Sequence, residues 1–340
     1  MGSLRQAVCL AVAATVCWFS RVPAQAQGVF PGTWRSSTLG QLAALPEGRE
    51  GACADFSSAL VGSVGEDRIY LLHGFTSSGD TTDVRAYDID TNTWLDPAPT
   101  VGAGVPAKAE GAGVAVGGLV YCVGGRSGGS ATANVTVYDP TANTLANVAP
   151  MGTARAGVAV EKWGKFIYAF GGRSTPSGPC SGDPLDSAER YDTTTNTWSP
   201  INPPPTPVTD ATAVSKGGKI YLIGGCTAQG LANVTGDVQI YDPGTGSWSS
   251  GPIMPTARAS LAAEVLGNTI YAIGGLGSGG SNLDVVEALD LDKATWTAGL
   301  TPKPTPSSEV QAVAHGGTLY LPGGGSFGVA SSVFEAFRRK

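Results

Sequence analysis

The sequence has few charged residues and almost no histidine. Asp, Glu, Lys and Arg make up 14% of the 340 residues, and only two histidines are present. The formal net charge of −6 argues against a nucleic-acid-binding protein, because phosphate contacts require clustered Lys and Arg. Two histidines leave little material for a His-rich metal site. We therefore expect no nucleic-acid partner, no metal and no cofactor.

The sequence also lacks the composition of long helices. Glycine and proline together account for 72 residues. In a helix interior, Gly costs about 1 kcal/mol relative to Ala and Pro about 3 kcal/mol. The hydrophobic fraction of 42% is that of a packed domain rather than of a disordered chain. The composition therefore predicts many short strands joined by turns.

The longest apolar run, from Ala7 to Phe19, is too short to span a bilayer. Arg5 precedes it, and Ala24-Gln25-Ala26 follows it as a small-x-small cleavage motif. This arrangement is typical of a secretory signal peptide, residues 1–26, with an N-terminal membrane anchor as the alternative. We expect residues 27–340 to be secreted, or periplasmic in a Gram-negative host, with no membrane span after cleavage.

A segment of the form apolar-Tyr-x-x-Gly-Gly recurs with a period of 47 to 53 residues. The six copies are Ile69–Gly74, Val120–Gly125, Ile167–Gly172, Ile220–Gly225, Ile270–Gly275 and Leu319–Gly324, the first with His73 in place of a Gly. A Tyr-Asp pair with Trp six residues later follows the first five copies, except that Leu145 replaces Trp and Leu289 replaces Tyr. Each repeat thus predicts two apolar strands, and then a third and a fourth strand joined by a turn. Such a unit cannot bury its own faces, so it must pack against the neighbouring units.

The period, the Gly-Gly pair and the later Tyr and Trp resemble the kelch repeat, over residues 28–340. The resemblance implies an all-β, six-bladed kelch-type β-propeller of four-stranded antiparallel blades in one domain, residues 27–340. The sixth copy ends without a Trp, whereas Trp34 has no repeat of its own. We therefore expect the N-terminal strand to be the outer strand of the last blade, which closes the ring and removes an open edge.

The resemblance also implies where a ligand would bind. In kelch adaptors, the residue after Gly-Gly and the Arg that opens the innermost strand line a central pocket. The corresponding residues, with three acids near the same point, are Phe75, Arg126, Arg155, Arg173, Arg258, Glu110, Asp210 and Glu309. Arginine suits bidentate capture of carboxylates, which favours a propeller that recognises an acidic peptide or glycan. The alternative is that these arginines pair with the acids and hold the blades together.

An enzyme on the same scaffold is the second functional hypothesis. A sugar mutarotase or epimerase would combine these arginines with a Glu or Asp of raised pKa as the base. Glycine-rich segments that match nucleotide-binding or nucleophile-elbow patterns are not followed by a helix, so they predict no catalysis. His73 and His315 are predicted on opposite faces of the propeller, which argues against a shared metal site.

Four cysteines lie outside residues 1–26, in a chain that we expect to meet an oxidising compartment. Cys180 lies in the long loop of the third blade, and Cys226 follows the Gly-Gly pair of the fourth, on the same face. A disulfide between these two is predicted. Cys53 and Cys122 are interpreted as buried thiols.

Two Asn-x-Thr sequons begin at Asn134 and Asn233. They predict glycosylation in a eukaryotic host, in loops before third strands on the face that carries the pocket. We expect a monomer whose partner is a protein, a peptide or a glycan.

Overall fold

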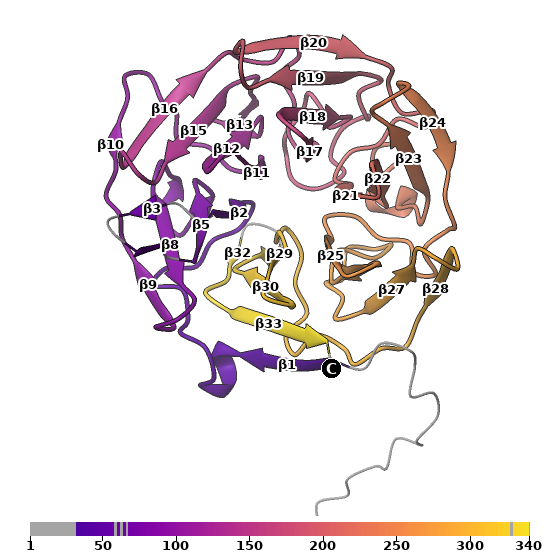
Figure 1. Ribbon diagram of the computed structural model, residues 1–340. Coiled ribbons are helices and arrows are strands. Elements are labelled where there is room, and N and C mark those ends of the chain that lie inside the picture. The colour runs from indigo at the N-terminus through magenta and orange to yellow at the C-terminus, as the bar shows by residue number, and fades with distance from the viewer. Residues whose placement is uncertain (1–31, 58–59, 62–63, 66, 327–328, 340) are drawn as a thin grey trace, which may run out of the picture.

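The computed structural model describes residues 32–57, 60–61, 64–65, 67–326 and 329–339. The predicted signal peptide, residues 1–26, lies outside the described residues. Six sheets surround a central axis like the blades of a propeller (Figure 1). This arrangement confirms the six-bladed all-β prediction. Among the described residues, the helical segments are the short 3-10 turns η1 (Ser37–Leu39) and η2 (Leu231–Asn233), and none is long and apolar enough to cross a membrane.

Each blade contains four antiparallel strands, and the innermost strand comes first. Blade 1 comprises β2 (Cys53–Ser57), β5 (Arg68–Leu72), β8 (Val84–Asp88) and β9 (Thr93–Leu95). Blade 2 comprises β11 (Ala112–Val116), β12 (Leu119–Val123), β15 (Val135–Asp139) and β16 (Thr144–Val148), and β10 (Thr100–Val101) pairs parallel to β16. Blade 3 comprises β17 (Ala159–Trp163), β18 (Phe166–Phe170), β19 (Ala188–Asp192) and β20 (Thr197–Ile201).

The remaining three blades follow the same order. Blade 4 comprises β21 (Thr212–Lys216), β22 (Lys219–Ile223), β23 (Val238–Asp242) and β24 (Ser247–Ser250). Blade 5 comprises β25 (Ala262–Leu266), β26 (Thr269–Ile273), β27 (Val286–Asp290) and β28 (Thr295–Thr297). Blade 6 comprises β29 (Val313–His315), β30 (Thr318–Pro322), β33 (Phe334–Arg339) and β1 (Gly32–Ser36).

The N-terminal strand closes the ring, as predicted. β1 pairs antiparallel with β33 and forms the outer edge of blade 6, where the two ends of the described chain lie side by side (Figure 1). Trp34 packs against Phe337 with ring centroids 5.2 Å apart. Its indole N–H donates to the carbonyl oxygen of Thr301, 3.2 Å away, which lies in the connection from blade 5.

The repeated Trp performs the same task in other blades. Each of these indoles donates its N–H to a backbone carbonyl of the segment that leads in from the preceding blade: Trp94 to Ala43, Trp198 to Ala149, Trp248 to Asn202 and Trp296 to Pro252. Apolar side chains of neighbouring blades form the core between them; Val114 of blade 2, for example, packs in one cluster with Ile167 of blade 3. The Trp side chain thus makes both an apolar contact and a hydrogen bond to the segment from the preceding blade, and together these fix the spacing of the two blades.

In the described part of the chain, four short two-stranded hairpins lie in the connections between the main blade strands. They are β3 (Leu60–Val61) with β4 (Val64–Gly65), β6 (Phe75–Thr76) with β7 (Gly79–Asp80), β13 (Arg126–Ser127) with β14 (Ser130–Ala131), and β31 (Gly325–Ser326) with β32 (Val329–Ala330). The last three begin directly after the Gly-Gly position of blades 1, 2 and 6. They therefore build up one face of the propeller in these blades.

Candidate functional site

A closed ring of six backbone hydrogen bonds surrounds the propeller axis. Each blade contributes one residue just before its innermost strand, and its N–H donates to the carbonyl of the equivalent residue in the preceding blade at 2.7–3.1 Å. In chain order the ring residues are Gly51, Glu110, Gly157, Asp210, Ser260 and Glu309. All six have φ between 50° and 58°. The structure therefore brings the three predicted acids to one axis, on alternate blades 2, 4 and 6.

The residue after each Gly-Gly pair lies beside this ring. Isolated backbone bridges join it to the residue that precedes the ring residue, as between Ala156 and Arg173. The Arg173 side chain is fully buried, and its guanidinium donates to the carboxylates of both Asp210 and Glu110. Arg173 thus connects the ring acids of blades 2 and 4.

Arg126 occupies the same repeat position in blade 2. Its Nε donates to Glu110 Oε1 at 2.7 Å, and its NH2 lies 3.2 Å from Asp80 Oδ1. The guanidinium carbon is 5.0 Å from the centre of the Phe75 ring, in cation–π geometry. The Arg126 side chain is 21% exposed, so that part of this group is open to solvent.

The structure does not bring Arg155 and Arg258 to the ring, which corrects the expected convergence of four guanidinium groups. Both side chains are fully buried inside their own blades. Arg155 NH2 lies 2.8 Å from Glu189 Oε1, and Arg258 NH1 lies 2.6 Å from Glu287 Oε2. Each arginine also donates to a carbonyl at the end of its blade's second strand. The reason is local: a buried guanidinium needs a carboxylate and carbonyl acceptors, and the blade supplies both.

Sequence reasoning missed the equivalents of these two arginines. Arg49 and Lys108 lie, like Arg155 and Arg258, two residues before the ring residue, and both are buried. Arg49 NH1 donates to the His73 carbonyl, and Lys108 Nζ donates to the Cys122 carbonyl at 2.9 Å. The spacing to the ring residue is the signal that could have identified them.

A cavity of about 330 Å³ lies at the mouth of the axis on one side of the ring. Its lining includes Phe75, Arg126 and the ring acids Glu110 and Glu309. The segment Pro176–Pro179 of blade 3 covers part of it. A narrower space of about 120 Å³ on the other side is lined by the inner strands and by all three ring acids.

The axis is acidic rather than basic. Among the described residues that line the two cavities, Arg126 is the one basic side chain, and the acids are Glu50, Glu110, Glu161, Asp210, Glu264 and Glu309. This corrects the expectation that the four arginines line the pocket. Arg155 and Arg258 point into the blades, and Arg173 is paired with two ring acids.

The third ring acid differs from the other two. The Glu309 carboxylate has no hydrogen-bond or ion-pair partner among the described residues, whereas Glu110 contacts Arg126 and Arg173. Burial, and then the carboxylates of Glu50, Glu110 and Asp210, raise the pKa of Glu309 well above its ordinary value. Burial also raises the pKa of Glu110, although its arginine partners oppose the shift.

The predicted Cys180–Cys226 disulfide is present, with the two Cα atoms 5.8 Å apart. It joins the long loop of blade 3 to blade 4. The backbone N–H of Cys180 donates to Asp210 Oδ2 at 2.8 Å, which ties the loop directly to a ring acid. The disulfide therefore anchors the segment Pro176–Pro179 over the mouth cavity.

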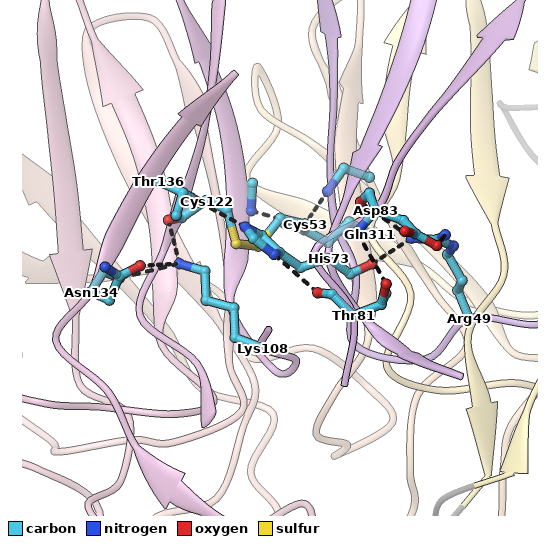
Figure 2. The surroundings of a disulfide bond; sticks show 12 residues. Arg49, Cys53, His73, Thr81, Asp83, Lys108, Cys122, Asn134, Thr136 and Gln311 are labelled. Atoms are coloured by element: carbon cyan, nitrogen blue, oxygen red, sulfur yellow. Dashed lines mark hydrogen bonds and ion pairs between the residues drawn. A yellow bond between two sulfur atoms is a disulfide. The ribbon is translucent and has the colours of Figure 1, made fainter. Parts of the chain in front are cut away.

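Cys53 and Cys122 also form a disulfide, with their Cα atoms 5.5 Å apart, so the interpretation as buried thiols is wrong. The bond joins β2 of blade 1 to β12 of blade 2 (Figure 2). Cys53 lies on the innermost strand of blade 1 and Cys122 on the second strand of blade 2. The two blades approach closely there, because a Cβ on Gly113 of β11 would lie 2.5 Å from the Ala54 nitrogen. The sequence pattern located both strands but not their contact.

Lys108 and His73 lie beside this disulfide (Figure 2). His73 is buried, and its Nε2 lies 2.7 Å from Thr136 Oγ1. Burial, and then the charge of Lys108, lower the pKa of His73 well below 6.5. Burial lowers the pKa of Lys108 to about 7.

His315 does not lie near His73; its Nε2 is 2.9 Å from Asp67 Oδ2. Within the described ranges, no group of three His, Cys, Asp or Glu side chains is placed to hold a metal ion.

The two sequons lie in different surroundings. Asn233 is exposed in η2. Asn134 is partly buried directly before β15, and its amide nitrogen donates to Asn147 Oδ1 at 2.8 Å. Its side-chain oxygen lies 3.4 Å from Lys108 Nζ.

Comparison with known proteins agrees with the repeat pattern. The family model described as the KLHDC2/KLHL20/DRC7 Kelch-repeats domain matches residues 112–324. The chain is 31% identical to Kelch-like protein terF of Aspergillus terreus over 212 residues, which is 58% of this chain and 42% of that protein. It is 32% identical to human Kelch-like protein 34 over 152 residues, 42% of this chain and 21% of that protein. The chain thus spans less than half the length of these curated relatives.

Proposed function

Because this chain belongs to the kelch-repeat family, we propose that it is a secreted interaction propeller that binds a peptide segment or a glycan at the mouth cavity. Kelch propellers typically serve as protein-interaction scaffolds. The proposal adds the place of binding, the ligand class and the compartment to that general role.

The mouth cavity is the observation that carries this proposal. Its volume of about 330 Å³ is within the range of ligand pockets. It combines an aromatic ring, Phe75, with a partly exposed arginine, Arg126, and these residue types dominate binding energy at protein interfaces. The ring of backbone hydrogen bonds beneath it supplies a rigid floor, which lowers the entropy lost on binding.

An acidic group on the ligand would meet Arg126. This guanidinium is the one at the cavity with exposed area, and Glu110 and Asp80 hold it in place. Arg173 acts behind it, because it occupies the second oxygen of Glu110. The proposed contact with an acidic peptide or glycan therefore rests on Arg126 alone.

Peptide and glycan arrays, followed by titration of any hit, test the proposal. Arg126→Gln should weaken an acidic hit by at least about tenfold, because a hydrogen bond to a charged group contributes about 1.5–3 kcal/mol. Arg190→Gln is the matched control, since Arg190 stacks on Phe166 in blade 3 and does not line the mouth. Hits that bind Arg126→Gln and Phe75→Ala as tightly as the unmodified protein would contradict binding at this mouth.

Secretion is proposed from residues 1–26 and agrees with two disulfides, which persist in oxidising compartments. N-terminal sequencing of the exported protein should then begin at Gln27. In a eukaryotic host we propose a glycan at Asn233 before Asn134, because Asn233 is exposed whereas Asn134 is partly buried. Glycopeptide mass mapping reads both sites, and an unmodified Asn233 beside a modified Asn134 would reverse this order.

One observation favours an enzyme as the second candidate. Glu110 and Glu309 have raised pKa values close to Arg126, as a general acid or base acting on an acidic sugar requires. The protein should then accelerate anomer exchange of acidic sugars, which NMR can follow. The Glu309→Gln variant should lose this acceleration. Exchange at the uncatalysed rate would remove this candidate without affecting the binding proposal.

A further inference from the structure

The propeller contains an internal example of cation binding beside its ring. Arg173 belongs to blade 3, and its guanidinium fills the gap between the ring acids of blades 2 and 4. The ring residue of blade 3 is Gly157, and a Cβ added there would lie 2.1 Å from Arg173 NH1. A glycine in the ring is therefore what makes room for the guanidinium.

The other gaps between alternate ring acids are related to this one by the blade repeat. The gap between Asp210 and Glu309 belongs to blade 5, where Leu276 takes the position of Arg173 and is fully buried. Its ring residue is Ser260 rather than glycine. The residue at this repeat position is therefore apolar and offers no cation to the two acids.

The gap between Glu309 and Glu110 belongs to blade 1 and is different. Its ring residue is Gly51, as in the gap that holds Arg173, but the position of Arg173 is taken by Phe75. The mouth cavity lies here, between Phe75, Glu110 and Glu309. Glu50 adds a third carboxylate to the cavity, at the position that Ala156 holds in blade 3. Among the described residues, the gap thus keeps the acids and the glycine of the blade 3 site without a cation from blade 1.

We propose that the blade 1 gap is a subsite for a guanidinium or ammonium group of the ligand, such as an Arg or Lys side chain of a partner peptide. The inference rests on the proposed function, since it places a second contact in the same mouth. The ligand cation would bind Glu309 and lie against Phe75, as Arg126 already does on that ring. With Arg126 contacting an acidic group, the mouth selects a ligand that carries both charges.

The state of Glu309 gives the subsite a signature. Its pKa is raised because burial and neighbouring carboxylates disfavour the charged form, and a bound cation favours that form. Binding should therefore release a proton and strengthen as the pH rises toward neutral. A ligand held by Arg126 alone would show neither effect.

One test needs no ligand. Phe75→Arg places in the blade 1 gap the residue that occupies the blade 3 gap, and Phe75→Met is the matched uncharged control. Relative to Phe75→Met, Phe75→Arg should raise the melting temperature at neutral pH by about 2–4 °C. The gain should disappear in Phe75→Arg combined with Glu309→Gln. Equal melting temperatures for the Arg and Met variants, or a gain that survives Glu309→Gln, would overturn the inference.

The second test uses small probes on the unmodified protein. N-acetyl-arginine amide and its neutral isostere N-acetyl-citrulline amide are titrated by NMR. The arginine probe should bind at least about tenfold more tightly, with the difference lost in Glu309→Gln and kept in Glu264→Gln, on the far side of the ring. Equal shifts for the two probes, or none, would overturn the subsite. An Arg126-dependent acidic hit alongside such a result would leave the proposed function standing.

Discussion

Blades 3 and 5 pair a buried cation with a glutamate, whereas blade 2 buries a lysine without a carboxylate. Arg155 contacts Glu189, and Arg258 contacts Glu287, the second residue of the third strand in each blade. In blade 2 this strand position holds Thr136, which contacts His73 instead. The Lys108 ammonium donates to the carbonyls of Cys122 and Asn134 (Figure 2).

The difference shows what is required at the repeat position two residues before the ring residue. All of these cations donate to a carbonyl at the end of the second strand, so the conserved task is hydrogen bonding rather than charge pairing. Arginine stays protonated and therefore needs a carboxylate when it is buried. Burial lowers the pKa of Lys108 to about 7, so this lysine can lose its proton. Blade 2 also has a covalent bond at this junction, between Cys53 and Cys122.

The largest expected effect breaks an Arg–Glu pair. Arg258→Met leaves Glu287 buried without its partner and should lower the free energy of unfolding by about 3–5 kcal/mol. The double variant Arg258→Met with Glu287→Leu removes both charges and should recover most of the loss. Urea denaturation measures both. A double variant as unstable as the single one would show that shape, and not charge, governs this position.

Removing the covalent bond of blade 2 should have the next largest effect. Cys53→Ala combined with Cys122→Ala should cost about 2–4 kcal/mol, because the bond closes a loop between residues 69 apart. Denaturation of the oxidised protein and the variant under identical conditions gives the difference. If the double variant is as stable as the parent, blade 2 does not rely on the disulfide in the way argued above.

The pH dependence should also distinguish blade 2. Between about pH 7 and 10.5 the unfolded chain binds a proton at Lys108 that the folded chain lacks, so the free energy of unfolding should rise with pH in this window. The slope from one proton is about 1.4 kcal/mol per pH unit. Below pH 6.5 His73 adds a further loss, because only the unfolded chain protonates it. Denaturation at a series of pH values, compared with Lys108→Met, isolates the lysine.

The smallest effect is expected for Lys108→Met at neutral pH. The substitution removes hydrogen bonds to two carbonyls but also removes a buried ammonium group, so these terms oppose each other. The net loss should be about 1 kcal/mol, well below that of Arg258→Met. A loss equal to that of Arg258→Met would end the distinction between the two kinds of blade.

The repeat pattern predicted the fold because each motif residue acts locally. Gly-Gly, Tyr and Trp34 define strand ends and blade contacts, so their spacing was enough to place six blades and the closing strand. The direction in which the Arg155 side chain points was not predictable in this way. It depends on Glu189, which is 34 residues later in the sequence but within hydrogen-bonding distance in the fold. The Cys53–Cys122 bond depends on the distance between two blades, which the repeat pattern does not specify.

The closed ring of backbone hydrogen bonds separates what holds the molecule together from what it displays. Only main-chain atoms form the ring, so the ring itself requires no particular side chain where space allows one. Gly51 and Gly157 are fixed, because a Cβ there would lie less than 3 Å from neighbouring atoms. Glu110, Asp210, Ser260 and Glu309 adopt the same backbone conformation with three different side chains. One unchanged frame thus carries side chains with different tasks: Glu110 and Asp210 hold Arg173, whereas Glu309 faces the mouth cavity.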